Sequence, residues 1–366
     1  MKLTGILSAM TVLALAVTAC GTSSGGGGGG GTSSKKIALL LPETKTARYE
    51  SKDRPLFEAK VKALCSDCQI IYSNANQDAA AQQSQAEAAL TNGAKVLVLD
   101  AVDGAAAAAI ANKAKQSNVP VISYDQLILN TPNVNFYISF DNQAVGKLQG
   151  MSLLQALGSK ANPSIVMING APTDNNAKLF KQGAHSVLDG KVEIVKEDAA
   201  ANWKPEEAQQ LMEQFIAAVG KDGFDGAYCA NDGTAGGAIA AMKTAGIDPK
   251  TRPITGQDAE VAAVQRILSG EQYMTVYKAI QPEAEKTAEL ACGLFKGEKP
   301  AAESKVNNGT IDVPSVLLTP IAVTATGSGT TKSVADTIVK DKFYGPDTVA
   351  KICKGFEPVC QAASIK

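Results

Sequence analysis

The sequence predicts an α/β fold made of two similar lobes, each with a mostly parallel sheet between helices. Short apolar runs alternate with helix-forming stretches almost without interruption, which is the pattern of parallel strands buried on both faces. In addition, roughly 330 residues follow Lys36, more than one hydrophobic core usually supports. Two consecutive βα series in one chain therefore indicate two lobes that face each other across a cleft.

The first series covers residues 36–142, and its elements are assigned from apolar runs of strand length and the helix-forming stretches between them. We expect strands at 36–41, 69–73, 95–100, 119–124 and 136–142, with helices at 53–64, 78–92 and 104–117. In the second series we expect strands at 164–169, 192–196, 226–230, 253–256 and 273–277, with helices starting near Gln143, Asn175, Pro205, Thr234 and Ala259. A final helix from Pro282 to Phe295 precedes a Pro-, Asn- and Gly-rich stretch and a strand at 316–319.

Five of the predicted strands end in the same way, with an acidic residue that often stands beside an amide. These strand ends carry Asp100, Asp125-Gln126, Asp141-Asn142, Asn231-Asp232 and Gln257-Asp258. In an open α/β sheet, ligands bind at the carboxyl ends of the strands. A cleft rich in acids and amides, with few cations, suits a neutral ligand covered in hydroxyl groups, and this points to a sugar.

The N-terminus predicts export and a lipid anchor. Lys2 is the only charge among the first 34 residues, and an apolar stretch follows that is too short for a comfortable transmembrane helix. Val17-Thr18-Ala19-Cys20 then resembles a bacterial lipobox, so we expect a signal peptide over 1–19 and lipidation of Cys20. The alternative is an ordinary signal peptide followed by a chance cysteine.

The segment 20–35 continues this prediction, because residues 21–34 are only Gly, Thr and Ser. Such a chain is a flexible tether with a reach of roughly 20 Å. It lacks the preceding strand and the following Lys of a phosphate-binding loop. We therefore expect the protein to lie on the outer face of the cell membrane, in contact with it through the lipid alone.

Charge and histidine content exclude several classes of function. After cleavage before Cys20, 34 basic and 36 acidic residues remain, which gives a net charge of −2 and no basic excess for nucleic acid. His185 is the sole histidine, and no G-x-S-x-G motif is present, so hydrolase triads and multi-histidine metal sites are excluded. We expect no enzymatic activity, no cofactor and no metal.

Six cysteines remain after Cys20, and an even number in an exported chain favours disulfides. Six cysteines allow fifteen connectivities, among which the sequence does not choose. The expected pairs are Cys65–Cys68, Cys229–Cys292 and Cys353–Cys360. Cys65 and Cys68 form a C-x-x-C motif that can mark a redox site, but no basic neighbour is present to lower a thiol pKa, so a structural disulfide is favoured.

Several longer motifs resemble one family. These are FYISFDN (136–142), DNNAKLF (174–180), NDGTAGGAI (231–239), GQDAE (256–260), MTVYK (274–278) and NNGTIDVPSVLLTP (307–320). Together they make the chain similar to the type I periplasmic sugar-binding proteins of ABC transporters, in particular the D-xylose-binding group, over essentially all of 36–345. The resemblance implies two Rossmann-like lobes joined by three crossings that close around a pyranose, and delivery of the unchanged sugar to a permease.

The resemblance also implies a set of ligand-binding residues. The matching positions are Arg48, Tyr49, Asp125, Asp174, Asn176, Trp203, Asn231, Asp258 and Lys278. There are two departures from the family pattern. Family members commonly carry Trp where this chain has Tyr49, and the xylose binders carry Arg where it has Gln126. Gln keeps donor and acceptor capacity but loses the charge and the five-donor fork, which weakens binding of the same sugar or indicates a different one.

Some of these residues also have a structural interpretation. Trp203, the only tryptophan, stands among polar residues, which favours stacking on a sugar over a place in the core. One of Asp174, Asn175 and Asn176 is expected to cap a helix. Asn231 is the better ligand candidate, with Asp232 as the helix cap.

Other charged and amide residues leave similar alternatives. Asp258 and Lys278 could form a structural salt bridge, bind a hydroxyl, or do both. Arg48 lies in a polar loop, where most arginines are only solvated. Asp100 is expected to act as a cap or turn residue, and Asp141 with Asn142 stands either at a lobe crossing or on the sugar.

The sequence as a whole predicts a lipid-anchored monomer that captures a monosaccharide, D-xylose first, for an ABC importer. We expect the N-terminal lobe to comprise 36–142 plus 281–316 and the C-terminal lobe 143–280 plus 317–366. One alternative is a binder of glucose or galactose that serves uptake or sensing. An alternative of another class is an exported thiol–disulfide enzyme that uses Cys65 and Cys68.

Overall fold

A computed structural model describes residues 35–299 and 301–365 of the chain. These residues belong to one compact unit that begins at Ser34. The predicted signal peptide (1–19), Cys20 and all of the tether except Lys35 lie outside the described residues. No helix in the described part of the chain combines the length and the apolar character needed to cross a bilayer.

The N-terminal lobe is built on a seven-stranded sheet in the order β10-β11-β5-β4-β3-β1-β2. Neighbouring strands are parallel, except that β10 runs antiparallel to β11. The strands are β1 (Lys36–Leu41), β2 (Gln69–Asn74), β3 (Ala94–Leu99), β4 (Val121–Tyr124), β5 (Phe136–Phe140), β10 (Ser304–Asn307) and β11 (Asp312–Leu318). The helices are α1 (Arg54–Leu64), α2 (Ala79–Thr91), α3 (Ala107–Gln116) and α9 (Ile280–Phe295), and a wider helical turn, η1 (Tyr49–Asp53), leads into α1.

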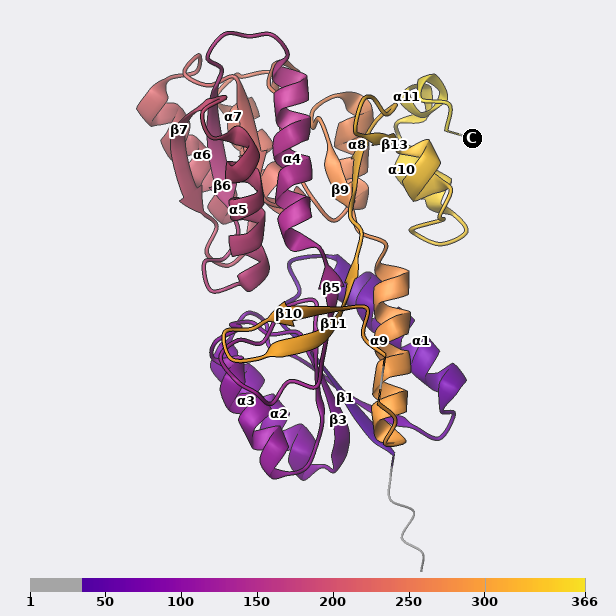
Figure 1. The fold of residues 1–366 in the computed structure, drawn as a ribbon. Coiled ribbons are helices and arrows are strands. Elements are labelled where there is room, and N and C mark those ends of the chain that lie inside the picture. The colour runs from indigo at the N-terminus through magenta and orange to yellow at the C-terminus, as the bar shows by residue number, and fades with distance from the viewer. Residues whose placement is uncertain (1–34, 300, 366) are drawn as a thin grey trace, which may run out of the picture. The chain divides into compact units, whose positions relative to one another are not determined.

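Both faces of this sheet are covered, which explains why β1 is apolar along its whole length. Ala38 and Leu40 point to the face covered by α2 and α3, and Ile37 and Leu39 point to the face covered by α1 and α9. The two helical layers are visible in Figure 1. Successive side chains of a strand point to opposite faces, so a strand between two helical layers has to be apolar at every position.

The C-terminal lobe contains two small sheets, with the orders β7-β6-β8 and β13-β12-β9. The strands are β6 (Ser164–Asn169), β7 (Glu193–Ala199), β8 (Gly226–Cys229), β9 (Thr275–Tyr277), β12 (Ile321–Thr324) and β13 (Lys332–Ser333). The helices are α4 (Asn142–Leu157), α5 (Asn175–Leu188), α6 (Pro205–Val219), α7 (Asp232–Thr244), α8 (Val261–Ser269), α10 (Thr348–Cys353) and α11 (Glu357–Ala362), with short turns η2 (Pro249–Thr251) and η3 (Ala335–Val339). Helices α4 and α5 pack on one face of β6, and α6 and α7 pack on the other.

The chain passes between the lobes three times. It leaves β5 for α4 at Asp141, leaves β9 for α9 after Lys278, and leaves β11 for β12 near Pro320. Two α/β lobes with parallel sheets and three crossings were predicted for this chain, and the prediction is confirmed.

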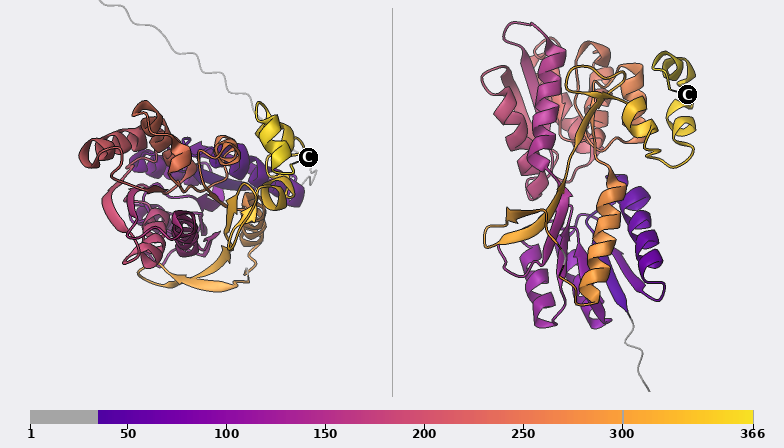
Figure 2. Two further views of the ribbon diagram at one scale, coloured as in Figure 1. Left: turned by 90° about the horizontal axis from the view of Figure 1, so that it is seen from above. Right: turned by 45° about the vertical axis from the view of Figure 1, so that its right-hand side comes forward.

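Two parts of the C-terminal lobe differ from the sequence prediction. The strand expected at 253–256 is reduced to one bridge between Ile254 and Ala227. Thr255 bonds to β8 through both its backbone and its side chain. Its N–H donates to the Ala227 carbonyl at 3.1 Å, and its hydroxyl accepts from the Cys229 N–H at 3.0 Å and donates to the Cys229 carbonyl at 3.2 Å. The sequence predicts no element from Ile321 onward, but this segment forms β12, β13, α10 and α11 and packs on α8, where it is yellow in Figure 2.

The structure joins Cys65 to Cys68 and Cys353 to Cys360. The predicted pair Cys229–Cys292 is wrong, because both thiols are free and buried. Cys229 lies on β8 in the core of the C-terminal lobe, whereas Cys292 lies on α9 in the core of the N-terminal lobe. The prediction failed because an even cysteine count carries no information on which lobe each cysteine enters.

Candidate functional site

The carboxyl ends of the strands surround a cavity of about 450 Å³, counting all the space between its lining atoms. This figure includes space that is open to solvent. The lining comprises Pro42, Glu43, Thr46, Arg48, Tyr49, Gln77, Ala101, Val102, Asp125, Gln126, Asp174, Asn176, Phe180, Trp203, Asn231, Gln257, Asp258 and Lys278. All ten residues predicted to bind ligand are in this set, so the fold brings them to one place; that each contacts a ligand stays a prediction.

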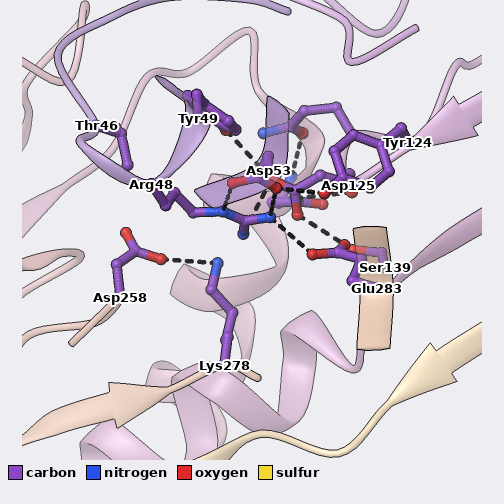
Figure 3. A network of polar contacts seen from close by, with 12 residues as sticks. Thr46, Arg48, Tyr49, Asp53, Tyr124, Asp125, Ser139, Asp258, Lys278 and Glu283 are labelled. Atoms are coloured by element: carbon purple, nitrogen blue, oxygen red, sulfur yellow. Dashed lines mark hydrogen bonds and ion pairs between the residues drawn. The ribbon is translucent and has the colours of Figure 1, made fainter. Parts of the chain in front are cut away.

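Arg48 follows β1 and is almost completely buried. Its Nε donates to Asp53 Oδ2 at 2.9 Å, and its Nη2 donates to Asp53 and to Glu283 Oε2, the latter at 2.7 Å. Its Nη1 lies 3.5 Å from Asp125 Oδ2 (Figure 3). A polar loop therefore places this arginine inside the protein, where three carboxyl groups surround one guanidinium.

Asp125 directly follows β4 and has a φ of +52°, a conformation that costs energy for a residue other than glycine. Its carboxylate accepts from the Tyr49 hydroxyl at 3.2 Å. Burial on its own raises the pKa of Asp125, but Arg48 and Lys278 outweigh burial and hold the pKa below its usual value. Asp125 is therefore an ionised acceptor at the cavity.

Gln126 also lines the cavity and is 6% exposed. Its Oε1 accepts from the backbone N–H of Asn176 at 3.4 Å, so it reaches the first turn of α5. The backbone of Gln126 is held by Ser123, whose hydroxyl donates to the Gln126 carbonyl at 2.6 Å. Gln126 thus reaches both the cavity and the first turn of α5 in the other lobe.

Asp174 is the cap of α5, with its Oδ1 accepting from the N–H groups of Asn176 at 2.6 Å and Ala177 at 3.1 Å. Its other oxygen accepts from the indole N–H of Trp203 at 3.1 Å. Burial, with a further contribution from Asp125, raises the pKa of Asp174 to about 6. The expected cap among 174–176 is therefore Asp174, a lining residue, whereas Asn175 is not part of the lining.

The indole ring of Trp203 is held against the backbone that follows β6. A Cβ at Gly170 would lie 1.9 Å from Trp203 Cη2, so the ring occupies space that only a glycine leaves free. Trp203 is 8% exposed and has a φ of +58°. A rigidly held aromatic face at a polar cavity suits the C–H face of a sugar.

Asn231 lies two residues after β8 and is the cap of α7, which corrects the prediction that Asp232 has this role. The Asn231 Oδ1 accepts from the Thr234 N–H at 2.9 Å in a capping box. Asp232 instead accepts from Gln272 Nε2 at 2.7 Å and from the Thr275 hydroxyl at 2.9 Å. Burial raises the pKa of Asp232 to about 7, and this carboxyl holds the scaffold behind the cavity.

Asp258 and Lys278 form an ion pair of 2.9 Å, and both are almost completely buried at the cavity. Asp258 has a φ of +93°, so it is held in a conformation that an L residue rarely adopts. The interpretation as a salt bridge and the interpretation as a ligand group are compatible, since a hydroxyl can donate to one member and accept from the other.

Three further strand-end residues lie outside the lining. Asp100 does not cap the following turn, because the N–H groups there bond to Asp103. Burial, then Asp125, raises the pKa of Asp100 well above its usual value. Asp141 caps α4, and the Asn142 amide donates to Asn176 Oδ1 at 2.7 Å. Asp141 and Asn142 therefore belong to the crossing, and Asn142 orients a lining residue.

Sequence reasoning missed several polar residues of the lining. Glu43, Thr46, Gln77 and Gln257 belong to this set. Gln257 is expected from the sequence among the polar strand ends of the cleft, but not among the ligand-binding residues. The other three lie in loops after β1 and β2, where nothing in the local pattern separates a cavity residue from a solvated one.

The cavity holds two cationic side chains, Arg48 and Lys278, against the carboxyl groups of Glu43, Asp125, Asp174 and Asp258. The remaining polar groups are amides and hydroxyls. Such a lining offers an anion no excess of positive charge, and it offers many donors and acceptors to a neutral polyol.

Cys65 and Cys68 lie between the end of α1 and the start of β2, at the amino end of that strand. The cavity lies at the carboxyl ends, so the C-x-x-C motif is not part of it. Ligand atoms of Cys65, Asp67 and Cys68 lie within 4.8 Å of one another. The two sulfurs are bonded to each other, however, and are not available as thiolate ligands.

Comparison with known proteins adds the family. Residues 37–299 match the family model described as "Periplasmic binding protein domain". The chain is 37% identical over 318 residues to a D-xylose-binding periplasmic protein of Haemophilus influenzae, covering 86% of this chain and 91% of that protein. It is 36% identical over 266 residues to the multiple sugar-binding periplasmic receptor ChvE of Rhizobium radiobacter, covering 67% and 75%.

Solved structures are similar as well. One is an ABC transporter solute-binding protein from Clostridium phytofermentans with bound β-D-glucose, at a TM-score of 0.76 and 30% identity, covering 86% of this chain and 99% of that one. Another is a carbohydrate transporter solute-binding protein from Chloroflexus aurantiacus in complex with D-glucose, at a TM-score of 0.76 and 28% identity, covering 85% and 97%.

Proposed function

Because the chain belongs to the family of type I periplasmic sugar-binding proteins, we propose that it captures a monosaccharide between its lobes and delivers it unchanged to an ABC importer. The observation that carries this proposal is the single cavity in which Trp203, two cations, four carboxyl groups and several amides meet. With the predicted bounds, the lobes 36–142 plus 281–316 and 143–280 plus 317–366 would close around the sugar, and the permease would recognise the closed form.

The chemistry of the cavity fits a pyranose. Each sugar hydroxyl both donates and accepts, so it suits pairs such as Asp258 with Lys278 and Arg48 with Asp125. Hydrogen bonds to charged groups contribute about 1.5–3 kcal/mol each, so a few of them give a directional site. The indole of Trp203 covers the remaining C–H face.

D-xylose is the first candidate, since two relatives at 37% identity are D-xylose-binding proteins by name. Glucose is the second, because two similar solved structures hold it. Thermal unfolding of the mature protein against a panel of monosaccharides tests both. We expect xylose to raise the melting temperature most. A panel in which no sugar stabilises the protein would contradict the proposal as a whole.

Replacing Gln126 with Arg is expected to tighten xylose binding about tenfold, because a charged forked donor makes stronger hydrogen bonds than an amide. Asp125 and Asp174 stand close to this position and would accept the added charge. Calorimetry of the parent and Gln126→Arg with xylose, glucose and galactose measures the effect.

The other outcomes of this substitution are equally informative. Weaker binding of every sugar would mean that the cavity has adapted to a ligand that the longer side chain crowds. An unchanged affinity profile would mean that residue 126 does not touch the ligand, and its assignment would be withdrawn.

Membrane anchoring through Cys20 is a separate part of the proposal, supported by the lipobox and the tether. Cys20→Ser should release the protein from the membrane or leave it unprocessed, because serine cannot carry the thioether-linked lipid. Fractionation and gel mobility measure this. A variant that fractionates and migrates like the parent would contradict lipidation at Cys20.

A further inference from the structure

Arg48 is the one guanidinium in the cavity lining, and its donors are unequally used. Nε and Nη2 donate to carboxylates, whereas Nη1 is buried without a hydrogen-bond partner among the described residues and has only an ion-pair contact with Asp125 Oδ2 at 3.5 Å. A buried donor without a partner is costly, so such a group in a cavity is a candidate for contact with ligand. If Arg48 recognises the ligand, recognition therefore depends on the groups that hold the guanidinium so that Nη1 points toward the ligand.

Two carboxyl groups on different helices hold the other side of the guanidinium. Asp53 lies at the junction of η1 and α1, and Glu283 lies in the first turn of α9. Glu283 is completely buried, and its Oε2 accepts from Arg48 Nη2 at 2.7 Å (Figure 3). The chain enters α9 just after Lys278, so Glu283 is tied to a lobe crossing but is not itself part of the lining.

The contact between Glu283 and Arg48 depends on an acceptor oxygen more than on a negative charge. Three carboxyl groups, those of Asp53, Asp125 and Glu283, share one guanidinium, so full ionisation would leave two uncompensated negative charges in the interior. Burial raises the pKa of Glu283 well above its usual value, although Arg48 opposes the shift. Burial thus favours the neutral form of Glu283, and that form still offers Oε2 as an acceptor to Arg48 Nη2.

We propose that Glu283 is a positioning residue for sugar recognition, which holds Arg48 through Nη2 so that Nη1 is directed to a ligand hydroxyl. The inference rests on the proposed function and deepens it, because it places a determinant of affinity outside the cavity lining. It also explains why a buried carboxyl group lies on α9, a helix whose Ala284 and Ala288 pack in the apolar core.

Three variants test the proposal. Glu283→Leu removes the acceptor and keeps the volume roughly unchanged, so monosaccharide affinity should fall about tenfold, the size of one lost hydrogen bond to a charged group. Glu283→Gln keeps an acceptor oxygen and should stay within about threefold of the parent. Thr287→Val is the matched control, because its hydroxyl bonds only to the Glu283 carbonyl within α9. It should leave affinity unchanged.

Calorimetry with the best sugar of the panel gives affinity, and thermal unfolding gives stability, so a purely structural role is separable. If Glu283→Leu is destabilised but binds within twofold of the parent, the proposal is wrong. An equal loss of affinity in the Leu and Gln variants would also contradict it, since an amide oxygen would then not replace the carboxyl. If the parent itself binds no sugar, the proposed function is wrong. That result is distinct from the two outcomes that contradict the role of Glu283.

Discussion

Trp203→Ala should weaken sugar binding by about 2 kcal/mol or more, as buried aromatic residues at the centre of binding sites do. The indole ring lies at the cavity, is held against Gly170, and donates its N–H to Asp174 at 3.1 Å. Removing it takes away both the apolar face and the group that fixes one oxygen of Asp174. Calorimetry with the preferred monosaccharide measures the loss.

Trp203 is also the only tryptophan, so its fluorescence reports directly from the site. Addition of a bound sugar should change the emission of the parent. Trp203→Phe is the matched control, because it keeps an aromatic face but loses the N–H donor, and it should bind with intermediate affinity. Unchanged affinity in Trp203→Ala would place this residue in the scaffold and end its assignment to the ligand.

Replacing Arg48 with Met should lower the free energy of unfolding by about 3 kcal/mol or more and abolish sugar binding. The substitution leaves Asp53, Asp125 and Glu283 buried without their shared cation, and breaking such a buried network typically costs about 3–5 kcal/mol. Urea unfolding followed by circular dichroism gives the stability, and calorimetry gives the binding.

The pH dependence of this variant provides a second readout. Without Arg48, burial should raise the pKa of Asp125 and Glu283 above their values in the unfolded chain. The folded state then binds more protons than the unfolded state, so the stability deficit should shrink as the pH falls. Arg48→Met combined with Glu283→Leu should recover part of the lost stability. A variant as stable as the parent, with a parallel pH profile, would show that the network contributes nothing.

The strand ends show how far sequence reasoning reaches. Apolar runs followed by an acid or an amide predicted parallel strands with their polar ends on one edge, and Asp125, Asn231 and Asp258 do lie together at one cavity. This succeeds because burial on both faces dictates continuous apolar strands, and parallel strands in βα units all present their carboxyl ends on the same side. The longer motifs around these residues indicated the family.

Glu283 shows where such reasoning stops. It stands in the first turn of a helix, where an acidic residue is ordinary, and nothing local marks it as the partner of an arginine that is 235 positions away. The predicted disulfide between Cys229 and Cys292 was wrong for a related reason, because the pairing depends on which lobe each cysteine enters. Asn231 lines the cavity as expected but also caps α7, the role expected of Asp232, because the capping geometry depends on where the backbone leaves β8.

By itself, the sequence determined the α/β class, the two lobes, the polar edge and the identity of the family, because all of these depend on local pattern and on motifs. The tertiary structure alone decided which carboxyl groups share a cation, which of them line the cavity, and which stand behind it. The physical reason is that charge pairing and burial act between residues that meet only after both lobes have folded, so distance along the chain carries no information about them.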